Sequence, residues 1–341
     1  MTGIEFNCSP TMIGSMPQKD PGEACALVAK YLRDVPAWPQ LTRRSYLEDM
    51  NVQFSEGFPG VVVGENKIHV DRSQDLTAQM ERLYAAYLAG DAGSFPIGAD
   101  YAAGLHRFLA LEDLAPRAVK GQVTGPVTWG LSVTDETGRA IVYDEALGDA
   151  VPKFLRLKAA WQERELRKLC PRTIIFVDEP YLSAFGSVTM NLSRQQVIAL
   201  LEEVFGGITG VRGVHCCGNT DWSILLACRV HVISYDAYNY AASLALYPAE
   251  VNRFLEKGGV IAWGIVPNTA EALAKESVAS LRDRLGEAMA PFTRNGVRFR
   301  DLVAQGLLTP SCGLEGLSPA ASETCLELLV KLSEEIKRKY R

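Results

Sequence analysis

One histidine and two cysteines carry the donor atoms best suited to metal chemistry in this sequence. His215 and Cys217 stand two residues apart at the end of an apolar run, and Cys312 ends another apolar run far downstream. Imidazole nitrogen and thiolate sulfur are preferred ligands of zinc, and a structural zinc site fills all four positions, often from Cys-x2-Cys pairs. The chain contains no such pair. Three donors with an open fourth position therefore indicate a zinc site that binds a thiol substrate.

The spacing of these residues indicates how they meet. At a strand end His215 and Cys217 point to the same side, whereas Cys216 points away. An alternative is that His215 makes ordinary hydrogen bonds and that the thiols only fill space. Cys312 argues against this alternative, because it lies at a matching strand end and is followed by Gly, as Cys217 is.

Carboxylates follow two other apolar runs. Asp178 and Glu179 are adjacent, so we expect one of them to reach a cavity and the other to brace its wall. Asp236 ends a further run, and it is a candidate fourth zinc ligand, hydrogen-bond partner of His215 or substrate anchor. The segment Ile13-Gly14-Ser15 exposes backbone and hydroxyl groups that can hold a carboxylate, although such a segment is also typical of a simple turn.

Short β-rich runs alternate with helical patterns, which predicts parallel strands joined by crossover helices. The predicted strands cover residues 11–15, 37–41, 119–123, 173–178, 211–215, 231–236, 260–265 and 307–312. Eight such strands predict an α/β fold, a (β/α)8 TIM barrel with its active site at the carboxyl-terminal strand ends, over a single domain of residues 1–341. Residues 60–70 predict a β-hairpin inserted between the second and third strands. His231 opens a strand, so we expect it at the opposite end from the site.

Composition excludes several classes of partner. The net charge is -5 with no basic stripe, which argues against nucleic acid. Neither a secretory signal nor an apolar run of membrane-spanning length occurs, so we expect a cytoplasmic protein without a membrane partner. The eight cysteines are then thiols or metal ligands rather than a disulfide framework.

Five motifs together resemble the catalytic carboxyl-terminal barrel of cobalamin-independent methionine synthase, within the superfamily of uroporphyrinogen decarboxylase and the corrinoid methyltransferases. The motifs are Ile13-Gly14-Ser15-Met16-Pro17-Gln18, Thr124-Gly125-Pro126-Val127-Thr128, Asp178-Glu179-Pro180, His215-x-Cys217 and Cys312-Gly313-Leu314. The resemblance implies a Zn2+ cofactor on His215, Cys217 and Cys312, with Asp236 as the counterpart of a fourth, carboxylate ligand. It also implies that homocysteine, the thiol substrate, is held by Ile13, Gly14, Ser15, Asp178 and Glu56.

Three departures from the resemblance concern the methyl donor. Two folate-contacting positions hold Ser132 and Ala184, and the position of a proton-donating His holds Ile265; the chain also lacks the amino-terminal half of the full-length synthase. Methylfolate needs a proton donor for its leaving group, whereas a methylcorrinoid does not. The expected function is therefore methyl transfer from a methylcorrinoid, on a corrinoid protein as partner, to homocysteine. The alternatives are a coenzyme M methyltransferase, a uroporphyrinogen decarboxylase-like lyase and a non-enzymatic zinc or redox module.

Overall fold

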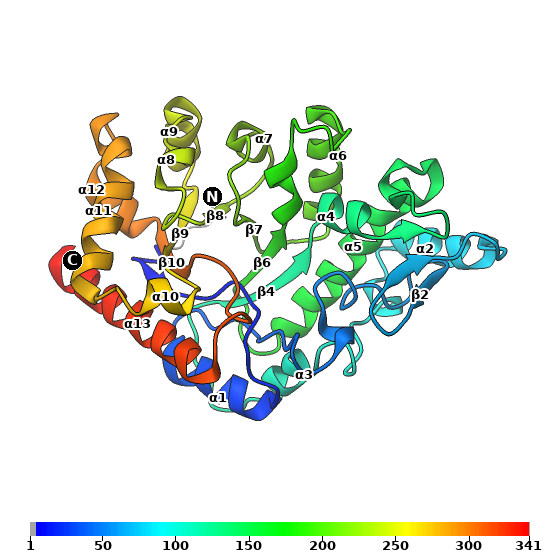
Figure 1. The fold of residues 1–341 in the computed structure, drawn as a ribbon, viewed down its shortest axis with the longest axis horizontal. Helices are drawn as coiled ribbons and strands as arrows, with labels where there is room; N and C mark the ends of the chain where they lie inside the picture. The colour runs from blue at the N-terminus through cyan, green and yellow to red at the C-terminus, as the bar shows by residue number, and fades with distance from the viewer. Residues whose placement is uncertain (1–4, 341) are drawn as a thin grey trace.

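A curved parallel sheet of seven strands forms the centre of the computed structural model, which describes residues 5–340 (Figure 1). The strand order is β1-β10-β9-β8-β7-β6-β4. The bounds are β1 Ser9–Pro10, β4 Val119–Thr124, β6 Thr173–Asp178, β7 Val211–Cys216, β8 Val232–Tyr235, β9 Val260–Val266 and β10 Gly306–Pro310. Almost every residue of these strands is buried, as expected for a parallel sheet covered on both faces. The architecture is a half-barrel, compatible with a TIM-barrel-like fold.

The first two predicted strands differ from the structure. Regular pairing of the first strand covers Ser9–Pro10 instead of residues 11–15, and residues 37–41 form no regular strand. Isolated bridges join Ala37 to Lys120 and Ser15 to Gln40, so this segment still lies between β4 and the residues after β1. Pro39 lies inside the segment and has no backbone N–H, which interrupts a continuous ladder.

Helices cover the outer face of the sheet. Their bounds are α1 Pro21–Tyr31, α2 Thr77–Ala89, α3 Ala103–Leu109, α4 Pro126–Ser132, α5 Glu145–Leu166, α6 Arg194–Phe205, α7 Trp222–Ala227, α8 Ala241–Leu244, α9 Pro248–Glu256, α10 Ala270–Leu273, α11 Val278–Arg294, α12 Phe299–Ala304 and α13 Pro319–Tyr340, with short 3-10 turns at Tyr46–Glu48, Ala92–Ser94, Ile141–Tyr143 and Pro180–Ala184. Helix α5 packs on β4 and β6, and α13 packs on β1, β9 and β10. Among residues 5–340, every helix is too short or too polar to cross a membrane.

Side chains alternate between the two faces of the sheet, so the strands contribute to two separate apolar clusters, one on the outer face and one on the inner face. On the outer face Trp263 of β9 packs against Phe292 of α11, with ring centroids 5.9 Å apart. A separate cluster fills the inner side of the sheet and takes most of its members from alternate strand positions. It contains Phe6, Val35, Ala118, Ile174, Phe176, Val211, Val232, Val260, Ala262 and Leu307. The inner side is therefore packed at the amino-terminal end of the strands, which leaves their carboxyl-terminal end for a site.

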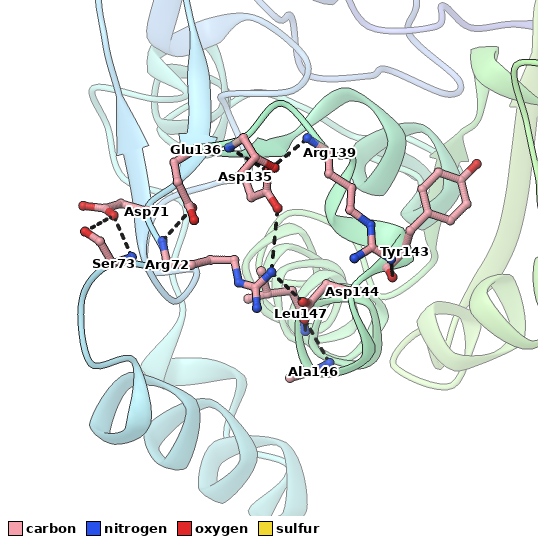
Figure 2. Close-up of polar contacts among 11 residues, drawn as sticks. Asp71, Arg72, Ser73, Asp135, Glu136, Arg139, Tyr143, Asp144, Ala146 and Leu147 are labelled. Atoms are coloured by element: carbon pink, nitrogen blue, oxygen red, sulfur yellow. Dashed lines mark hydrogen bonds and ion pairs between the residues drawn. The ribbon is translucent and has the colours of Figure 1, made fainter.

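A small three-stranded sheet lies at one end of the molecule, beside α2 (Figure 1). Strands β2 (Val61–Val63) and β3 (Ile68–Val70) pair antiparallel where the sequence predicts a hairpin, and β5 (Thr134–Asp135) pairs parallel with β3. Figure 2 shows the polar contacts that join this sheet to the start of α5. The Arg72 guanidinium lies 3.0 Å from the Asp144 carboxylate and 3.7 Å from that of Asp135.

Candidate metal centre and active site

His215, Cys217 and Cys312 converge at the carboxyl-terminal ends of two strands. His215 lies in β7, Cys217 follows that strand, and Cys312 follows β10. One ligand atom from each residue lies within 4.8 Å of the others, and Cys312 Sγ is 3.8 Å from His215 Nε2. Strands β8 and β9 separate β7 from β10, so the three side chains meet on the inner side of the sheet. The structure thus brings together the three donors that the sequence predicts.

Alternation along β7 separates the two neighbouring cysteines. Cys216 is fully buried in the outer apolar core, and its Sγ lies 3.6 Å from the carbonyl oxygen of Gly218. Burial raises the pKa of the Cys216 thiol to about 12, so this thiol stays protonated and unreactive. Cys217 is half-buried and belongs to the metal cluster, as predicted from its spacing to His215.

A serine on the neighbouring strand orients the His215 imidazole. Ser234 of β8 is the register partner of His215, and its Oγ lies 3.0 Å from His215 Nδ1. Both side chains are buried. When Nδ1 donates its proton to Ser234, Nε2 is left unprotonated and faces the two thiols. This is the tautomer that a metal-binding histidine needs.

The two thiols of the cluster differ in acidity. The Cys312 thiol donates a hydrogen bond to Cys217, and this bond together with His215 lowers the pKa of Cys217 to about 4 despite burial. The same hydrogen bond and burial raise the pKa of Cys312 well above its ordinary value. Cys217 is therefore the thiol of the pair that ionises more readily.

The loop after β9 braces the segment that carries Cys312. The Asn268 side-chain amide donates to the Gly313 carbonyl at 3.0 Å, and its carbonyl oxygen accepts from Ser311 Oγ at 3.0 Å. Gly313 is required by close packing, because a Cβ there would lie 2.0 Å from Ser15 Oγ. The Cys312 segment is consequently fixed against the Ile13 to Ser15 segment.

The adjacent carboxylates Asp178 and Glu179 have different surroundings. Glu179 is fully buried and accepts hydrogen bonds from the backbone N–H groups of Val127 and Thr128, at 2.9 and 2.7 Å, at the start of α4. Asp178 ends β6, and its Oδ1 is buried without a hydrogen-bond partner among the described residues. Burial raises the pKa of Asp178 to about 6, although Lys120 and His215 lower it. Glu179 therefore braces the wall, whereas Asp178 keeps an acceptor free for a ligand.

The predicted carboxylate-binding segment is held by buried polar side chains. The Ile13 carbonyl accepts a hydrogen bond of 2.6 Å from the Lys120 ammonium group, and Ser15 Oγ donates to Glu315 at 2.5 Å. A Cβ on Gly14 would lie 2.3 Å from the side-chain oxygen of Gln40, so only glycine fits. These contacts fix the backbone of the segment close to Cys312.

Lys120 also lies in the site, although it was not predicted from the sequence. It is fully buried, and its ammonium group lies 4.4 Å from the centre of the Phe176 ring on the inner side of the sheet. Burial lowers its pKa to about 8, and the nearby Asp178 charge opposes this shift. The signal in the sequence is the alternation of polar Lys120, Gln122 and Thr124 with smaller apolar residues along β4. Such alternation indicates one polar face in a buried strand.

Two predicted site residues lie outside the group of three donors. The two Asp236 oxygens accept hydrogen bonds from the backbone and side-chain amides of Asn239, at 2.8 and 2.7 Å. Its pKa is raised by burial and by the nearby Cys217, so it lies close to the cluster. Glu56 accepts a 2.8 Å hydrogen bond from the amide of Gly98, in the loop before α3. The roles of Asp236 and Glu56 stay predictions.

Solved methyltransferase structures share this fold. The B12-independent methionine synthase from Shewanella sp. W3-18-1, in complex with selenomethionine, superimposes with a TM-score of 0.60 at 15% identity, over 97% of this chain and 98% of that chain. A putative vitamin-B12 independent methionine synthase from Listeria monocytogenes matches with a TM-score of 0.55 at 12% identity, over 93% and 85% of the two chains. A methyltransferase from Methanosarcina mazei matches with a TM-score of 0.56 at 14% identity, over 93% and 86%.

No protein-family model and no curated protein sequence matches this chain. The likeness to solved structures therefore establishes a common fold. The activity has to be argued from the side chains of this chain.

Proposed function

We propose that this chain is a zinc-dependent methyltransferase that transfers a methyl group to the sulfur of a thiol substrate. The observation that carries the proposal is the cluster of His215, Cys217 and Cys312, whose ligand atoms lie within 4.8 Å of one another. The common fold with B12-independent methionine synthases and a methyltransferase supports the same class of reaction.

The donor set fits zinc in type and in spacing. Zinc–nitrogen and zinc–sulfur bonds of about 2.0 and 2.3 Å at tetrahedral angles place neighbouring ligand atoms roughly 3.5 to 3.8 Å apart. The Cys312 sulfur and the His215 Nε2 are 3.8 Å apart, and all three ligand atoms lie within 4.8 Å of one another, so a bound zinc ion would draw the donors slightly closer together. Two thiolates and one imidazole leave one position of a tetrahedral shell for a substrate thiol.

The residues of the chain have distinct tasks in this proposal. His215, Cys217 and Cys312 would hold the metal, and Ser234 orients the imidazole through its contact with Nδ1. When bound, zinc lowers the pKa of a coordinated thiol, so that the acceptor is a thiolate at neutral pH. The thiolate sulfur then attacks the methyl carbon, and the bond from that carbon to the donor breaks with its electron pair leaving on the donor.

Homocysteine is the acceptor that the free groups favour. Asp178 keeps one carboxylate oxygen without a partner and can accept from the substrate's ammonium group. The Ile13 to Ser15 segment lies beside Cys312 through the hydrogen bond from the Leu314 amide to the Ser15 carbonyl, at 2.9 Å, and we assign it the substrate carboxylate. An acceptor such as coenzyme M has no amino group, so Asp178 would have no ammonium group to bind.

For the methyl donor we propose a methylcorrinoid, bound to a corrinoid protein as partner. Ile265 occupies the position of the expected proton donor, and the whole of β9 reads Val-Ile-Ala-Trp-Gly-Ile-Val, so no residue of this strand is an acid. A corrinoid leaves without a proton, whereas folate nitrogen needs one.

Four assays test the proposal. Zinc-loaded protein is combined with methylcobalamin or methyltetrahydrofolate as donor, and with homocysteine or coenzyme M as acceptor. We expect turnover with methylcobalamin and homocysteine, and methylated thiol as the product. Turnover with methyltetrahydrofolate alone would contradict the donor assignment, and failure of all four combinations in the presence of bound zinc would contradict methyl transfer.

A further inference from the structure

A basic cavity of about 760 Å³ lies away from the candidate metal centre, at the amino-terminal ends of β7, β8 and β9. Helices α7 and α9 form its outer walls. Its basic lining residues are Arg194, Arg212, Arg229, Arg253, Lys257 and His231. Cavities of this size hold small-molecule ligands.

Three of the arginines have acidic partners. Arg194 lies 3.8 Å from Asp221, Arg253 lies 3.4 Å from Glu250, and Arg229 pairs with Glu202. Among residues 5–340, neither Arg212 nor Lys257 has an acidic partner within ion-pair distance. The cavity therefore has positive charge that the chain does not compensate.

In the contact between Arg212 and His231, two hydrogen-bond donors face each other. The backbone N–H of Arg212 donates to His231 Nδ1 at 3.1 Å, so the proton of the neutral imidazole is on Nε2. Burial and the neighbouring Arg212 lower the pKa of His231 to about 4, which keeps the ring neutral. Yet Nε2 lies 3.0 Å from a guanidinium nitrogen of Arg212, which is itself only a donor.

The Arg212 guanidinium also has a donor without any acceptor. Its Nε is buried and has no hydrogen-bond partner in the described part of the chain. Buried donors without acceptors are costly, and an oxyanion is the acceptor that a guanidinium binds best. An anionic oxygen beside both groups would accept from the guanidinium and from the His231 Nε2–H.

We propose that this cavity binds a small phosphate-bearing molecule through Arg212, His231 and Lys257. The cavity is larger than inorganic phosphate needs, so the ligand is an organic phosphate whose phosphate group contacts Arg212. A nucleic acid is not favoured, because the chain as a whole carries a net charge of -5.

Binding of two probes, inorganic phosphate and AMP, measured by isothermal titration calorimetry at low ionic strength, tests the proposal. We expect saturable binding of both to the zinc-loaded protein, with AMP the tighter. Arg212→Gln should weaken both roughly 10-fold to 100-fold, because a hydrogen-bonded ion pair is lost. Lys257→Gln, at the exposed residue that follows α9, should weaken both by a smaller factor. The matched control Arg300→Gln lies in α12, outside the cavity lining, and should change nothing.

Thermal denaturation of each variant separates loss of binding from loss of folding. If Arg212→Gln does not fold, the comparison of Lys257→Gln with Arg300→Gln shows whether the probes bind in the cavity. No saturable binding of either probe would overturn the proposal. Equal binding by the wild type and the cavity variants would overturn it too, as would binding of heparin without binding of AMP or phosphate.

Discussion

The two ends of the strands use histidine in opposite ways. At the carboxyl-terminal end the Nδ1 atom of His215 faces the Ser234 hydroxyl, which can accept its proton, and Nε2 faces the Cys312 thiol. At the amino-terminal end Nδ1 of His231 accepts from a backbone N–H, which leaves an Nε2–H donor toward a guanidinium group. The two rings therefore differ in the partner of Nδ1, and we propose that the first binds a soft cation and the second an anion.

The largest expected effect comes from removing a thiol at the carboxyl-terminal end. Cys217→Ser and Cys312→Ser should each abolish zinc retention and methyl transfer, because a serine hydroxyl is a poor zinc ligand at neutral pH. Metal content after gel filtration, followed by the methyl-transfer assay, measures this effect. Cys170→Ser is the control, because this buried thiol lies outside the cluster. Full zinc occupancy in either cluster variant would exclude that residue as a ligand.

Asp178→Asn tests the substrate subsite beside the metal. We expect the KM for homocysteine to rise roughly 10-fold to 100-fold, because a neutral amide replaces a charge-assisted bond to the ammonium group. Zinc content should not change, since Asp178 is not one of the three clustered donors. Steady-state kinetics make the measurement, with Asp283→Asn on the exposed side of α11 as the matched control. An unchanged KM would favour an acceptor without an amino group.

Ser234→Ala tests the comparison between the two histidines directly. Loss of the hydroxyl removes the partner of His215 Nδ1, and we expect zinc affinity to fall about 10-fold. Ser234→Thr keeps a hydroxyl and should retain most of the affinity. Competition with a chelator measures the zinc affinities. The rate of methyl transfer at saturating zinc should stay near that of the wild type. If alanine and threonine bind zinc alike, the imidazole is oriented by something other than Ser234.

Lys120→Met concerns the interior between the two ends, and we expect its effect to be on the pH dependence of stability. The pKa of Lys120 is lowered to about 8 by burial, below the unfolded value of about 10.4. Between these values the unfolded chain binds the proton more readily, so stability rises with pH across this window. The methionine variant should lack this rise, which amounts to roughly 1 to 3 kcal/mol. Urea denaturation of both proteins at pH 8, 9 and 10 measures the free energy of unfolding. If this free energy changes with pH equally in both proteins, Lys120 does not cause the rise.

The sequence predicts the donor cluster well because the prediction depends on short-range geometry. Alternation along a strand places His215 and Cys217 on one side and Cys216 on the other, whatever the remaining structure. Cys312 could be added to the predicted cluster because the carboxyl-terminal ends of parallel strands lie at the same edge of a sheet. Six of the strands were predicted within a few residues for the same reason: each is an uninterrupted buried run.

The features that the sequence did not predict depend on register between distant segments. Ser234 contacts His215 because β7 and β8 pair in one register, which no local pattern determines. Lys120 reaches the Ile13 carbonyl only because the segment after β1 curves across β4. Residues 37–41 were predicted as a strand from their apolar character, but Pro39 removes a donor from the ladder.

The most direct test of the central claim is zinc K-edge X-ray absorption of the purified protein, before and after addition of homocysteine. We expect one zinc per chain with two sulfur neighbours at about 2.3 Å and at least one nitrogen neighbour at about 2.0 Å. Homocysteine should raise the number of sulfur neighbours to three. Zinc without sulfur neighbours, or a sulfur count unchanged by homocysteine, would contradict a thiol-binding zinc site at His215, Cys217 and Cys312.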